Sequence, residues 1–463
     1  MAAVDADAGS GFRLQQDART QWKPNTAYVA GDIRMAPDGS TISRNANGTS
    51  GATFDATERA AWEAVLGNAG TIDQTTLNAS YAVIIKPEKY GAIGDGVADD
   101  TTAVTSAFAA ATALRRAVIG GNVFAPGATV VLEGTYKLST LAATIVASCN
   151  IDGARGKLIA PAAFASPVIL VGHETSGSIL QTATVKLPSI TKVGATSFAA
   201  ASVGVKIQNL HDSNVDGRRV DYFETAWLLT GLGQGTVYNR INIGRVDLCK
   251  KPLSLIPGAG GWVNSNTIAG GIGQSPNTLD GTGIRRSGWR HVTIDGSGGA
   301  GTVNGNTFDA MSFEGDLSEF YFDIKHASNN TWLGATRFEQ GTGARSVSLS
   351  SDTFTDNSHG LAIGDMVAFF ANTALAGLMK AGVAYYVQAV TANTFKVAAT
   401  RGGPAVTFTS NGTALVYYVP PRIKIDGTGG STYANEIKSG YYAYPGPLDI
   451  REINTPYSNP VAG

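Results

Sequence analysis

The chain has 463 residues, a length that suits an elongated repeat protein with small appended modules better than one compact domain. Its formal net charge is −1 and it has no long basic run, which argues against nucleic acid as a partner. Only 15% of the residues are charged and 57 are glycine, a composition typical of β-strands joined by tight turns. No apolar run approaches the roughly 18 residues needed to cross a membrane, so we predict no membrane insertion.

The two cysteines and the first residues give no sign of metal binding or export. Cys149 and Cys249 lie in separate strand-like segments, so we expect two buried side chains rather than a disulfide or a metal site. The sequence has no cluster of Cys and His with metal-ligand spacing, so we predict neither a metal nor a cofactor. Residues 1–10 lack the basic start and apolar core of a secretion signal, so a protein acting outside the cell would leave by another route, such as lysis.

The N-terminal part divides into a tail and a small module. Residues 1–20 are small and polar, and two interpretations stay open: a flexible tail and an attachment peptide. Residues 21–70 follow with short strand-like runs between turn residues, which indicates a small β-module.

This module carries the pattern Trp22-x(5)-Tyr28-x-x-Gly31-Asp32, with Trp62 further on. The pattern resembles small β-modules attached to chitinases and viral tail proteins. The chitinase modules bind sugars on exposed aromatic rings, so the resemblance implies the same role for Trp22, Tyr28 and Trp62. The alternative, which we favour, is that these rings form the core of a domain too small to have another.

A second motif runs from Tyr90 to Ala103 and reads Tyr-Gly-Ala-Ile-Gly-Asp-Gly-Val-Ala-Asp-Asp-Thr-Thr-Ala. Its glycines permit left-handed turns, and Asp99 and Asp100 can cap a helix. We predict that helix near residues 101–116. Its apolar face is expected at Val104, Phe108 and Ala111.

The motif strongly resembles the N-terminal motif of the pectate-lyase-like, right-handed parallel β-helix superfamily, found in many phage tailspikes and polysaccharide-degrading enzymes. In that superfamily the motif marks the fold and not the active site, so we interpret Asp95, Asp99 and Asp100 as structural. The resemblance implies a mainly β protein with a right-handed parallel β-helix, a solenoid, over residues 81–342. The predicted helix would cover the open N-terminal end of that solenoid.

Residues 343–420 interrupt the pattern and resemble a small all-β module that recurs in phage tail proteins. Residues 421–463 return to the solenoid pattern and supply the last coil and a C-terminal tail. Two roles stay open for the inserted module, a wall that contacts sugar and a structural insertion, and we favour the second.

An irregular repeat organises the solenoid. Residues 306–314 begin with Asn-Thr-Phe and end with Phe-Glu, and residues 330–339 begin with Asn-Thr-Trp and end with Phe-Glu. Fainter copies begin at Asn239 and Asn266. Repeats of a few tens of residues with short β-type runs are typical of a solenoid. We expect the asparagines to stack as an internal ladder whose amides hydrogen-bond along the helix axis.

The last residue of each copy gives the main functional prediction. Equivalent positions on successive coils of a parallel β-helix stack about 4.8 Å apart. The Phe before each Glu is expected to point inward, so that the Glu points outward. The repeat therefore predicts one outward column of hydrogen-bond acceptors, made of Asp247, Gln274, Glu314 and Glu339.

A glycoside hydrolase needs two carboxyl groups, one to protonate the leaving oxygen and one to activate water or to attack. These groups are about 5–5.5 Å apart in retaining enzymes and about 6.5–9.5 Å apart in inverting ones. Glu314 and Glu339 on neighbouring coils fit the first distance. Asp247 and Glu314, two coils and about 9.6 Å apart, fit the second. We predict these three residues as the catalytic candidates.

Polar and aromatic residues near the column are the substrate-binding candidates. They are Gln274, Trp332, Arg337, Asp323 and Glu224. An aromatic ring such as that of Trp332 can stack on a sugar face, although burial in the core is the alternative for each ring taken singly.

Two alternatives to a hydrolase stay open. A polysaccharide lyase would need a base, commonly Arg or Lys, and often Ca²⁺ held by several carboxylates. Arg337 and Lys325 are candidates for that base, but the sequence has no compact Asp cluster to mark a calcium site. A tail adhesin would bind the glycan without cutting it, and it would not need two converging carboxylates.

The resemblance and the column together predict a phage tailspike or minor tail protein that binds a bacterial surface polysaccharide and depolymerises it by glycoside hydrolysis. Tailspikes of this fold are typically homotrimers, so the resemblance implies a homotrimer that joins phage tail or baseplate proteins through its N-terminus. Such a protein is made in the host cytoplasm without a signal peptide, resides in the virion tail and acts at the bacterial cell surface.

Overall fold

The computed structural model contains two compact units, Met1–Ala82 and Val83–Gly463. The described residues are 4–5, 13–14, 23–28, 33–36, 41–44, 47–54, 62–64, 83–192, 198–273, 286–298, 303–314, 318–333, 336–339, 345–370, 383–408, 410–419, 423–428, 432, 434–437, 440–442 and 450–453. Among the helices in these ranges, none is long and apolar enough to cross a membrane.

The described part of the N-terminal unit contains short antiparallel strands. They are β1 (Val4–Asp5) with β2 (Arg13–Leu14), β3 (Ala27–Tyr28) with β6 (Gly48–Thr49), and a sheet of β4 (Ile33–Met35), β5 (Thr41–Arg44) and β7 (Trp62–Ala64). Tyr28 is only 4% exposed, and the Arg34 guanidinium lies 5.2 Å above its ring. Tyr28 is therefore a core residue and offers no free face to a sugar, whereas Trp22 and the Trp62 side chain lie outside the described residues.

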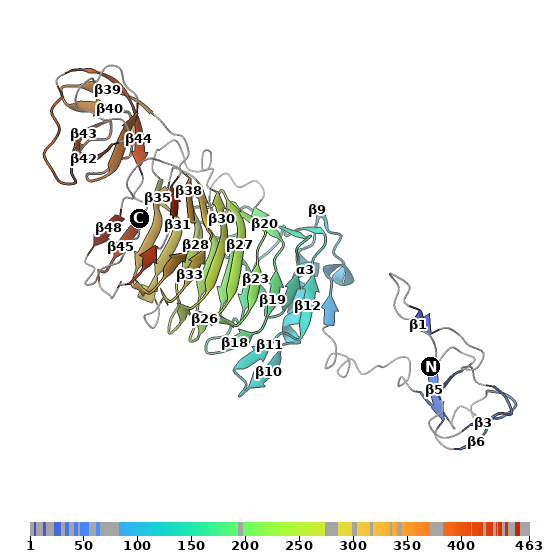
Figure 1. Cartoon of the computed structure of the whole chain (residues 1–463). Coiled ribbons are helices and arrows are strands. Elements are labelled where there is room, and N and C mark those ends of the chain that lie inside the picture. The colour runs from blue at the N-terminus through green and yellow to red at the C-terminus, as the bar shows by residue number, and fades with distance from the viewer. Residues whose placement is uncertain are drawn as a thin grey trace. The chain divides into compact units, whose positions relative to one another are not determined.

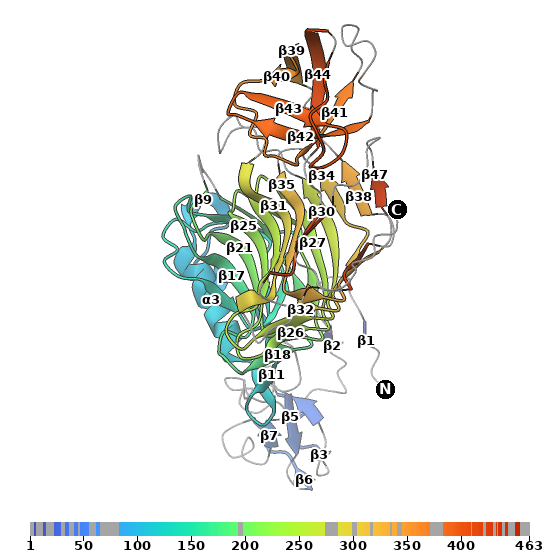
Figure 2. The ribbon, with the colours of Figure 1, turned by 90° about the vertical axis from the view of Figure 1, so that its left-hand side faces the viewer.

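Three sheets, parallel except for the first hairpin of the shortest one, form the β-helix of the second unit (Figures 1 and 2). The long sheet contains β8 (Val83–Ile85), β9 (Asp95–Asp99), β12 (Ala128–Val131), β13 (Thr135–Lys137), β15 (Asn150–Asp152), β16 (Lys157–Ala160), β19 (Thr184–Lys186), β20 (Ser189–Lys192), β23 (Asn214–Asp216), β24 (Arg219–Asp221), β27 (Arg240–Asp247), β30 (Thr267–Gly273), β33 (Thr307–Asp309), β34 (Ser312–Glu314), β37 (Thr331–Leu333), β38 (Thr336–Glu339), β46 (Glu436–Ile437) and β47 (Gly440–Tyr442).

The other two sheets complete the coils. The nine-stranded sheet contains β14 (Ile145–Ala147), β17 (Pro167–Gly172), β21 (Val203–Gln208), β25 (Thr225–Thr230), β28 (Lys251–Leu255), β31 (Arg286–Asp295), β35 (Ser318–Lys325), β45 (Ile423–Asp426) and β48 (Ile450–Ile453). The eight-stranded sheet contains β10 (Arg116–Ile119), β11 (Val123–Ala125), β18 (Ile179–Gln181), β22 (Leu210–His211), β26 (Gly235–Val237), β29 (Trp262–Asn264), β32 (Val303–Asn304) and β36 (Ala327–Ser328). Two 3₁₀ turns, η1 (Pro87–Tyr90) and η2 (Gly296–Gly298), lie between strands.

A typical coil passes through the nine-stranded sheet, then the eight-stranded sheet, and then twice through the long sheet. The chain does so in β21, β22, β23 and β24, after which β25 begins the next coil in parallel register with β21. Parallel strands linked by such crossovers are right-handed in nearly all proteins. The structure thus confirms the predicted fold class, a right-handed parallel β-helix.

Alternating side chains explain why the coils enclose one core. In β23, Val215 is buried between the exposed Asn214 and Asp216, the pattern expected of a strand with one face inward. The residues in register with Val215 form a continuous apolar stack: Val185, Ile241, Ile268, Phe308 and Trp332. Burying one such large side chain stabilises the fold by roughly 1.5–3 kcal/mol.

The predicted asparagine ladder is present. Asn239, Asn266, Asn306, Asn330 and Asn435 are at most 3% exposed. Each side-chain amide donates to the side-chain oxygen of the next asparagine, at 2.9, 3.0, 3.0 and 2.9 Å along the series. Those oxygens also accept the backbone N–H groups of the preceding asparagines at 3.1–3.3 Å. The ladder therefore ties five successive coils together inside the core.

The predicted cap is α3 (Thr101–Ala113), and its apolar face packs against the first coils. Val104, Phe108 and Ala111 are each fully buried, as expected for the covering side of a terminal cap.

The two aspartates before α3 form other hydrogen bonds than the helix caps that we predicted. Asp100 occupies the N-cap position, but its side chain makes no capping bond to the helix. Its carboxylate instead accepts the backbone N–H groups of Ile93 and Gly94, at 2.7 and 3.1 Å. The Asp99 carboxylate accepts the N–H groups of Thr101 and Ser139, both at 3.1 Å, and so ties the first residue of α3 to the chain after β13. The structural interpretation of the motif holds, with the two roles divided between neighbours.

The small all-β insertion lies in sequence between β38 and β45 and forms a closed barrel. Its strands are β39 (Arg345–Ser350), β40 (Thr353–Thr355), β41 (Met366–Phe370), β42 (Ala384–Val390), β43 (Thr394–Ala398) and β44 (Gly412–Val419). It has its own core around Phe354, whose ring stacks on Phe395 at 5.2 Å.

The two aspartates should differ in their effect on stability. We predict that Asp100→Ala lowers the free energy of unfolding by about 2 kcal/mol, because it leaves two backbone donors without their acceptor. Asp99→Ala should cost about 1 kcal/mol, as for loss of a helix cap. Urea unfolding followed by circular dichroism measures both, with Asp100→Asn as the control that keeps one acceptor. Wild-type stability of Asp100→Ala would contradict the role given to this carboxylate.

Candidate functional site

The strand register brings acidic residues of four coils into one column. Asp221 pairs with Asp247 across β24 and β27, and Asp247 pairs with Gly273 of β30. Gly273 pairs with Glu314, and Glu314 pairs with Glu339. We call Asp221, Asp247, Glu314 and Glu339 the acid column, and each level of the stack a rung. Gln274, predicted for this column, lies outside the described residues, and the rung belongs to Gly273.

A second row runs beside the acid column, two residues earlier on each strand. It contains Arg219, Arg245, Gly271, Ser312 and Arg337. On β24, β27, β30 and β34, the residue between the two rows is buried. These residues are Val220, Val246, Ile272 and Phe313. Because strand side chains alternate, the residues on either side of Val220 and Val246, which are Arg219, Asp221, Arg245 and Asp247, face away from the core. The sequence pattern is basic-apolar-acidic on β24, β27 and β38, Gly-Ile-Gly on β30 and Ser-Phe-Glu on β34.

Ion pairs fix the first two acids of the column. Arg219 Nε lies 2.7 Å from Asp221 Oδ2, and Arg245 Nε lies 2.6 Å from Asp247 Oδ2. Arg219 also contacts the acid of the next coil, with its Nη2 3.3 Å from Asp247 Oδ2. Burial raises the pKa of Asp221, although its hydrogen bond with Arg219 opposes the shift. Asp221 was absent from our predicted site, so the register adds a carboxyl group one rung from Asp247.

The rung after Asp247 carries no side chains on this surface. Gly271 and Gly273 occupy both outward positions, and a Cβ built on Gly271 would meet only the Gly244 carbonyl oxygen, at 4.0 Å. Asp247 and Glu314 stand on either side of this glycine rung, two rungs and about 9.6 Å apart along the stack. That spacing is near the upper limit for the two carboxyl groups of an inverting glycosidase.

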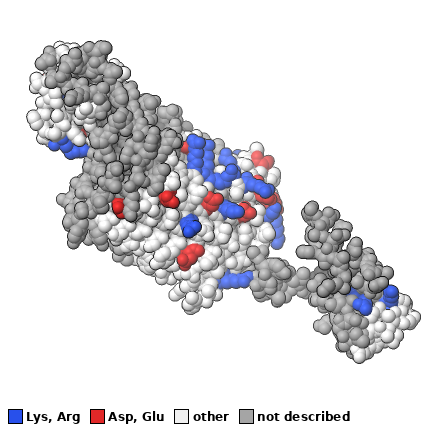
Figure 3. Space-filling view, viewed as in Figure 1, with Lys and Arg blue, Asp and Glu red and all other residues white. Residues whose placement is uncertain are grey.

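An open pocket of about 460 Å³ lies over β23, β33 and the first halves of β27 and β30 in the long sheet. Its polar lining residues are Asn214, Asp216, Arg240, Asn242, Thr267 and Asp309. The strands β27 and β30 contribute to both this polar pocket and the acid column. Figure 3 shows Lys and Arg interspersed with Asp and Glu on a face of the β-helix, above its largely uncharged lower part. Amide, hydroxyl and charged groups of this kind suit the hydroxyls of a sugar chain.

Two of the predicted binding residues lie on the nine-stranded sheet and not beside the column. Asp323 in β35 is paired with Arg290, whose Nε is 2.6 Å away. Glu224, just before β25, lies 3.4 Å from Lys251 Nζ. Both therefore belong to another surface of the coils.

Trp332 and Arg337 have different outcomes. Trp332 is fully buried and stacks on Phe308, with ring centroids 4.7 Å apart, so its predicted contact with substrate is wrong. It lies two residues after a ladder asparagine, which places it on the inward face of β37. Arg337 lies in the second row, one rung from Ser312, and its side chain is outside the described atoms.

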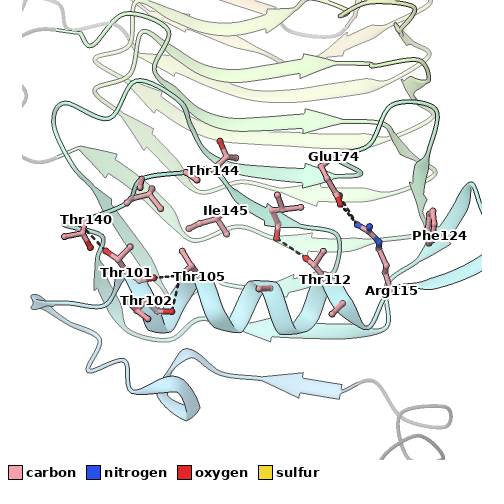
Figure 4. Close-up of a pocket in the computed structure, with 16 residues that line it drawn as sticks. Thr101, Thr102, Thr105, Thr112, Arg115, Phe124, Thr140, Thr144, Ile145 and Glu174 are labelled. Atoms are coloured by element: carbon pink, nitrogen blue, oxygen red, sulfur yellow. Dashed lines mark hydrogen bonds and ion pairs between the residues drawn. The ribbon is translucent and has the colours of Figure 1, made fainter.

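Another cavity, of about 820 Å³, lies between α3 and the loop that leads into β14 (Figure 4). Its polar groups are mostly engaged in holding the cap. Thr112 Oγ1 donates to the Val146 carbonyl at 3.0 Å, and Arg115 lies 2.8 Å from Glu174. Glu174 is the one acidic residue that lines this cavity among the described residues, so the cavity has no carboxyl pair for hydrolysis.

Within the described residues, no group of three or more His, Cys, Asp or Glu is arranged to hold a metal ion. Cys149 and Cys249 are both buried, as predicted, and burial raises the pKa of each thiol.

A scan against protein-family models found no matching family, and a comparison with curated proteins found no match. Solved structures with some likeness include ORF18 of Geobacillus virus E2, at 11% identity and a TM-score of 0.28, covering 84% of this chain and 86% of that one. The phiAB6 tailspike, determined with oligosaccharides of Acinetobacter baumannii surface polysaccharide, has 14% identity and a TM-score of 0.26. That match covers 70% of this chain and 56% of the tailspike. The Streptococcus pneumoniae adhesin PfbA has 12% identity and a TM-score of 0.26, with coverage of 57% and 76%.

Proposed function

We propose that the protein is a phage tailspike or minor tail protein that binds a bacterial surface polysaccharide and hydrolyses its glycosidic bonds at the acid column. The observation that carries this proposal is the strand register, in which Asp247, Gly273, Glu314 and Glu339 occupy equivalent positions of successive coils. The sugar chain would lie in the polar pocket and cross the glycine rung. The motif at residues 90–103 supports the tailspike class through its resemblance to that superfamily.

The column offers two carboxyl pairs, and Glu314 belongs to both. With Glu339, one rung and about 4.8 Å away, it forms a pair suited to retention of the anomeric configuration. With Asp247, two rungs away, it forms a pair suited to inversion. Arg245 Nε holds the Asp247 carboxylate at 2.6 Å, so in the inverting pair Asp247 would be the base that activates water. Glu314 would then be the general acid in the inverting pair.

The amide variants distinguish these two mechanisms. Glutamine keeps the shape of glutamate but cannot deliver a proton at neutral pH. We expect Glu314→Gln to lower the cleavage rate by about 10²–10⁴-fold in either mechanism. Glu339→Gln should do so only in a retaining enzyme, and Asp247→Asn only in an inverting one. Release of reducing ends from host polysaccharide measures the rate, and NMR of the first product gives its anomeric configuration.

Asp152→Asn is the matched control, because Asp152 is an exposed acid on the same sheet outside the column. Near-normal cleavage by all three column variants would move catalysis to other acids. Binding without any cleavage by the wild type would favour the adhesin, and an unsaturated sugar product would favour the lyase.

Filling the glycine rung tests where the sugar lies. The backbone of Gly271 is outside the left-handed region and an added Cβ meets open space, so Gly271→Gln should change the free energy of unfolding by no more than about 0.5 kcal/mol. We expect it to weaken glycan binding and cleavage at least tenfold, because its side chain would occupy the proposed path. Gly271→Ala, which leaves most of the space free, is the control. Full activity of the Gln variant would remove the glycine rung from the site.

The resemblance to tailspikes also supports a homotrimer that joins the phage tail through its N-terminal unit and acts at the bacterial surface. We expect sedimentation at three times the chain mass of 47.8 kDa. A single-chain mass at micromolar concentration would contradict the trimer without affecting the hydrolase proposal.

A further inference from the structure

A separate pocket of about 550 Å³ opens on the nine-stranded sheet, over β21, β25 and β28. Its polar side chains include Lys206, Glu224, Lys251 and Ser254, and we call it the lysine pocket. Lys206 faces outward, since its neighbours Val205 and Ile207 are fully buried in the core. The volume is within the range of small-molecule sites.

The charges of the lysine pocket leave one cation uncompensated. Lys251 Nζ is 3.4 Å from Glu224 Oε1, so these two charges offset each other. Lys206 has no hydrogen-bond or ion-pair partner among the described residues and is half-buried between strands. Burial lowers the pKa of Lys206, as expected for an ammonium group without a nearby carboxylate. The pocket therefore presents an unpaired positive charge on a partly dehydrated surface.

A hydroxyl in the same pocket also lacks a partner. Ser254 is 1% exposed, and its Oγ makes no hydrogen bond. Thr293, its register neighbour on β31, has a buried hydroxyl in the same condition. Buried polar groups in proteins are nearly always hydrogen-bonded, so the Ser254 hydroxyl at this pocket is available to an external partner.

We infer that the lysine pocket binds the carboxylate of an acidic sugar unit, such as a uronic acid residue of a polysaccharide. Lys206 would pair with the carboxylate, and Ser254 would hydrogen-bond to a sugar oxygen. Leu228, Ile256 and Pro257 supply apolar walls for the C–H face of the ring. This inference rests on the proposed glycan-binding function, and it adds the chemical class of glycan: an anionic one.

The test compares an acidic trisaccharide with its neutral counterpart. We would titrate the full-length protein with trigalacturonate, with the corresponding galactose trisaccharide and with acetate, by calorimetry or ligand-observed NMR. The wild type should bind trigalacturonate at least tenfold more tightly than either of the others. Lys206→Met, which removes the charge and keeps an apolar stem, should abolish that preference. Ser254→Ala should weaken trigalacturonate binding several-fold.

Lys89→Met is the matched control, because Lys89 is an exposed lysine of η1 that does not line the pocket. It should bind trigalacturonate like the wild type. Equal loss in both lysine variants would reduce the effect to net charge and overturn the inference. Unchanged binding by Lys206→Met, or equal affinity for acetate and trigalacturonate, would overturn it as well.

Two further measurements separate this inference from folding and from hydrolysis. Lys206→Met removes an unpaired, half-buried charge, so its urea midpoint should be no lower than that of the wild type. A lower midpoint would assign Lys206 a structural role and overturn the inference. If the wild type cleaves no glycan but its binding depends on Lys206, the hydrolase proposal fails and the lysine pocket stands.

Discussion

The buried asparagine ladder is the constraint on which the rest of the β-helix depends. Each rung satisfies one backbone N–H and several side-chain groups in the interior, where an unpaired amide costs about 1–3 kcal/mol. A slip of one residue between coils would break these bonds and also turn every strand side chain to the opposite face. The ladder therefore fixes which residues of distant repeats become neighbours, and the acid column is one consequence.

The fold, the cap helix and most of the acid column could be predicted from the sequence. Each follows from a local residue pattern that favours a single structure. Counting residues from the ladder asparagine failed where coils differ in length. Strand β27 carries an extra residue between Asn242 and Arg245, where Gly244 adopts a φ of 63°, so Asp247 pairs with Gly273 and not with the eighth residue after Asn266. Asp221 was missed because its coil has Ser213 at the ladder position, although the spacing of eight residues is kept.

Aromatic residues were the other limit of sequence reasoning. Trp332 and Tyr28 have large rings with one polar group, so each residue type suits both a buried core and a surface on which a sugar stacks. For Trp332 the strand register decides, because it continues the inward stack from Phe308. For Tyr28 the small size of the unit decides, since its ring is covered by Arg34 and its hydroxyl is tied to Lys23. In both cases the ring is buried in an apolar core, so it has no free face for a ligand.

A glycine rung in the middle of a long parallel sheet needs a reason of its own. Glycine weakens a strand, and within a sheet it often marks a place where a ligand or another backbone approaches closely. The neighbouring rungs have arginine or serine in the second row and an acid in the acid column. The rung of Gly271 and Gly273 differs, because it has no side chain in either row. The polar pocket is lined on the same strand by Ala269, two residues before Gly271, and Asp247 and Glu314 flank the glycine rung. A sugar chain crossing the long sheet here would meet a carboxyl group on each side, while the strands beneath stay locked in register by the ladder.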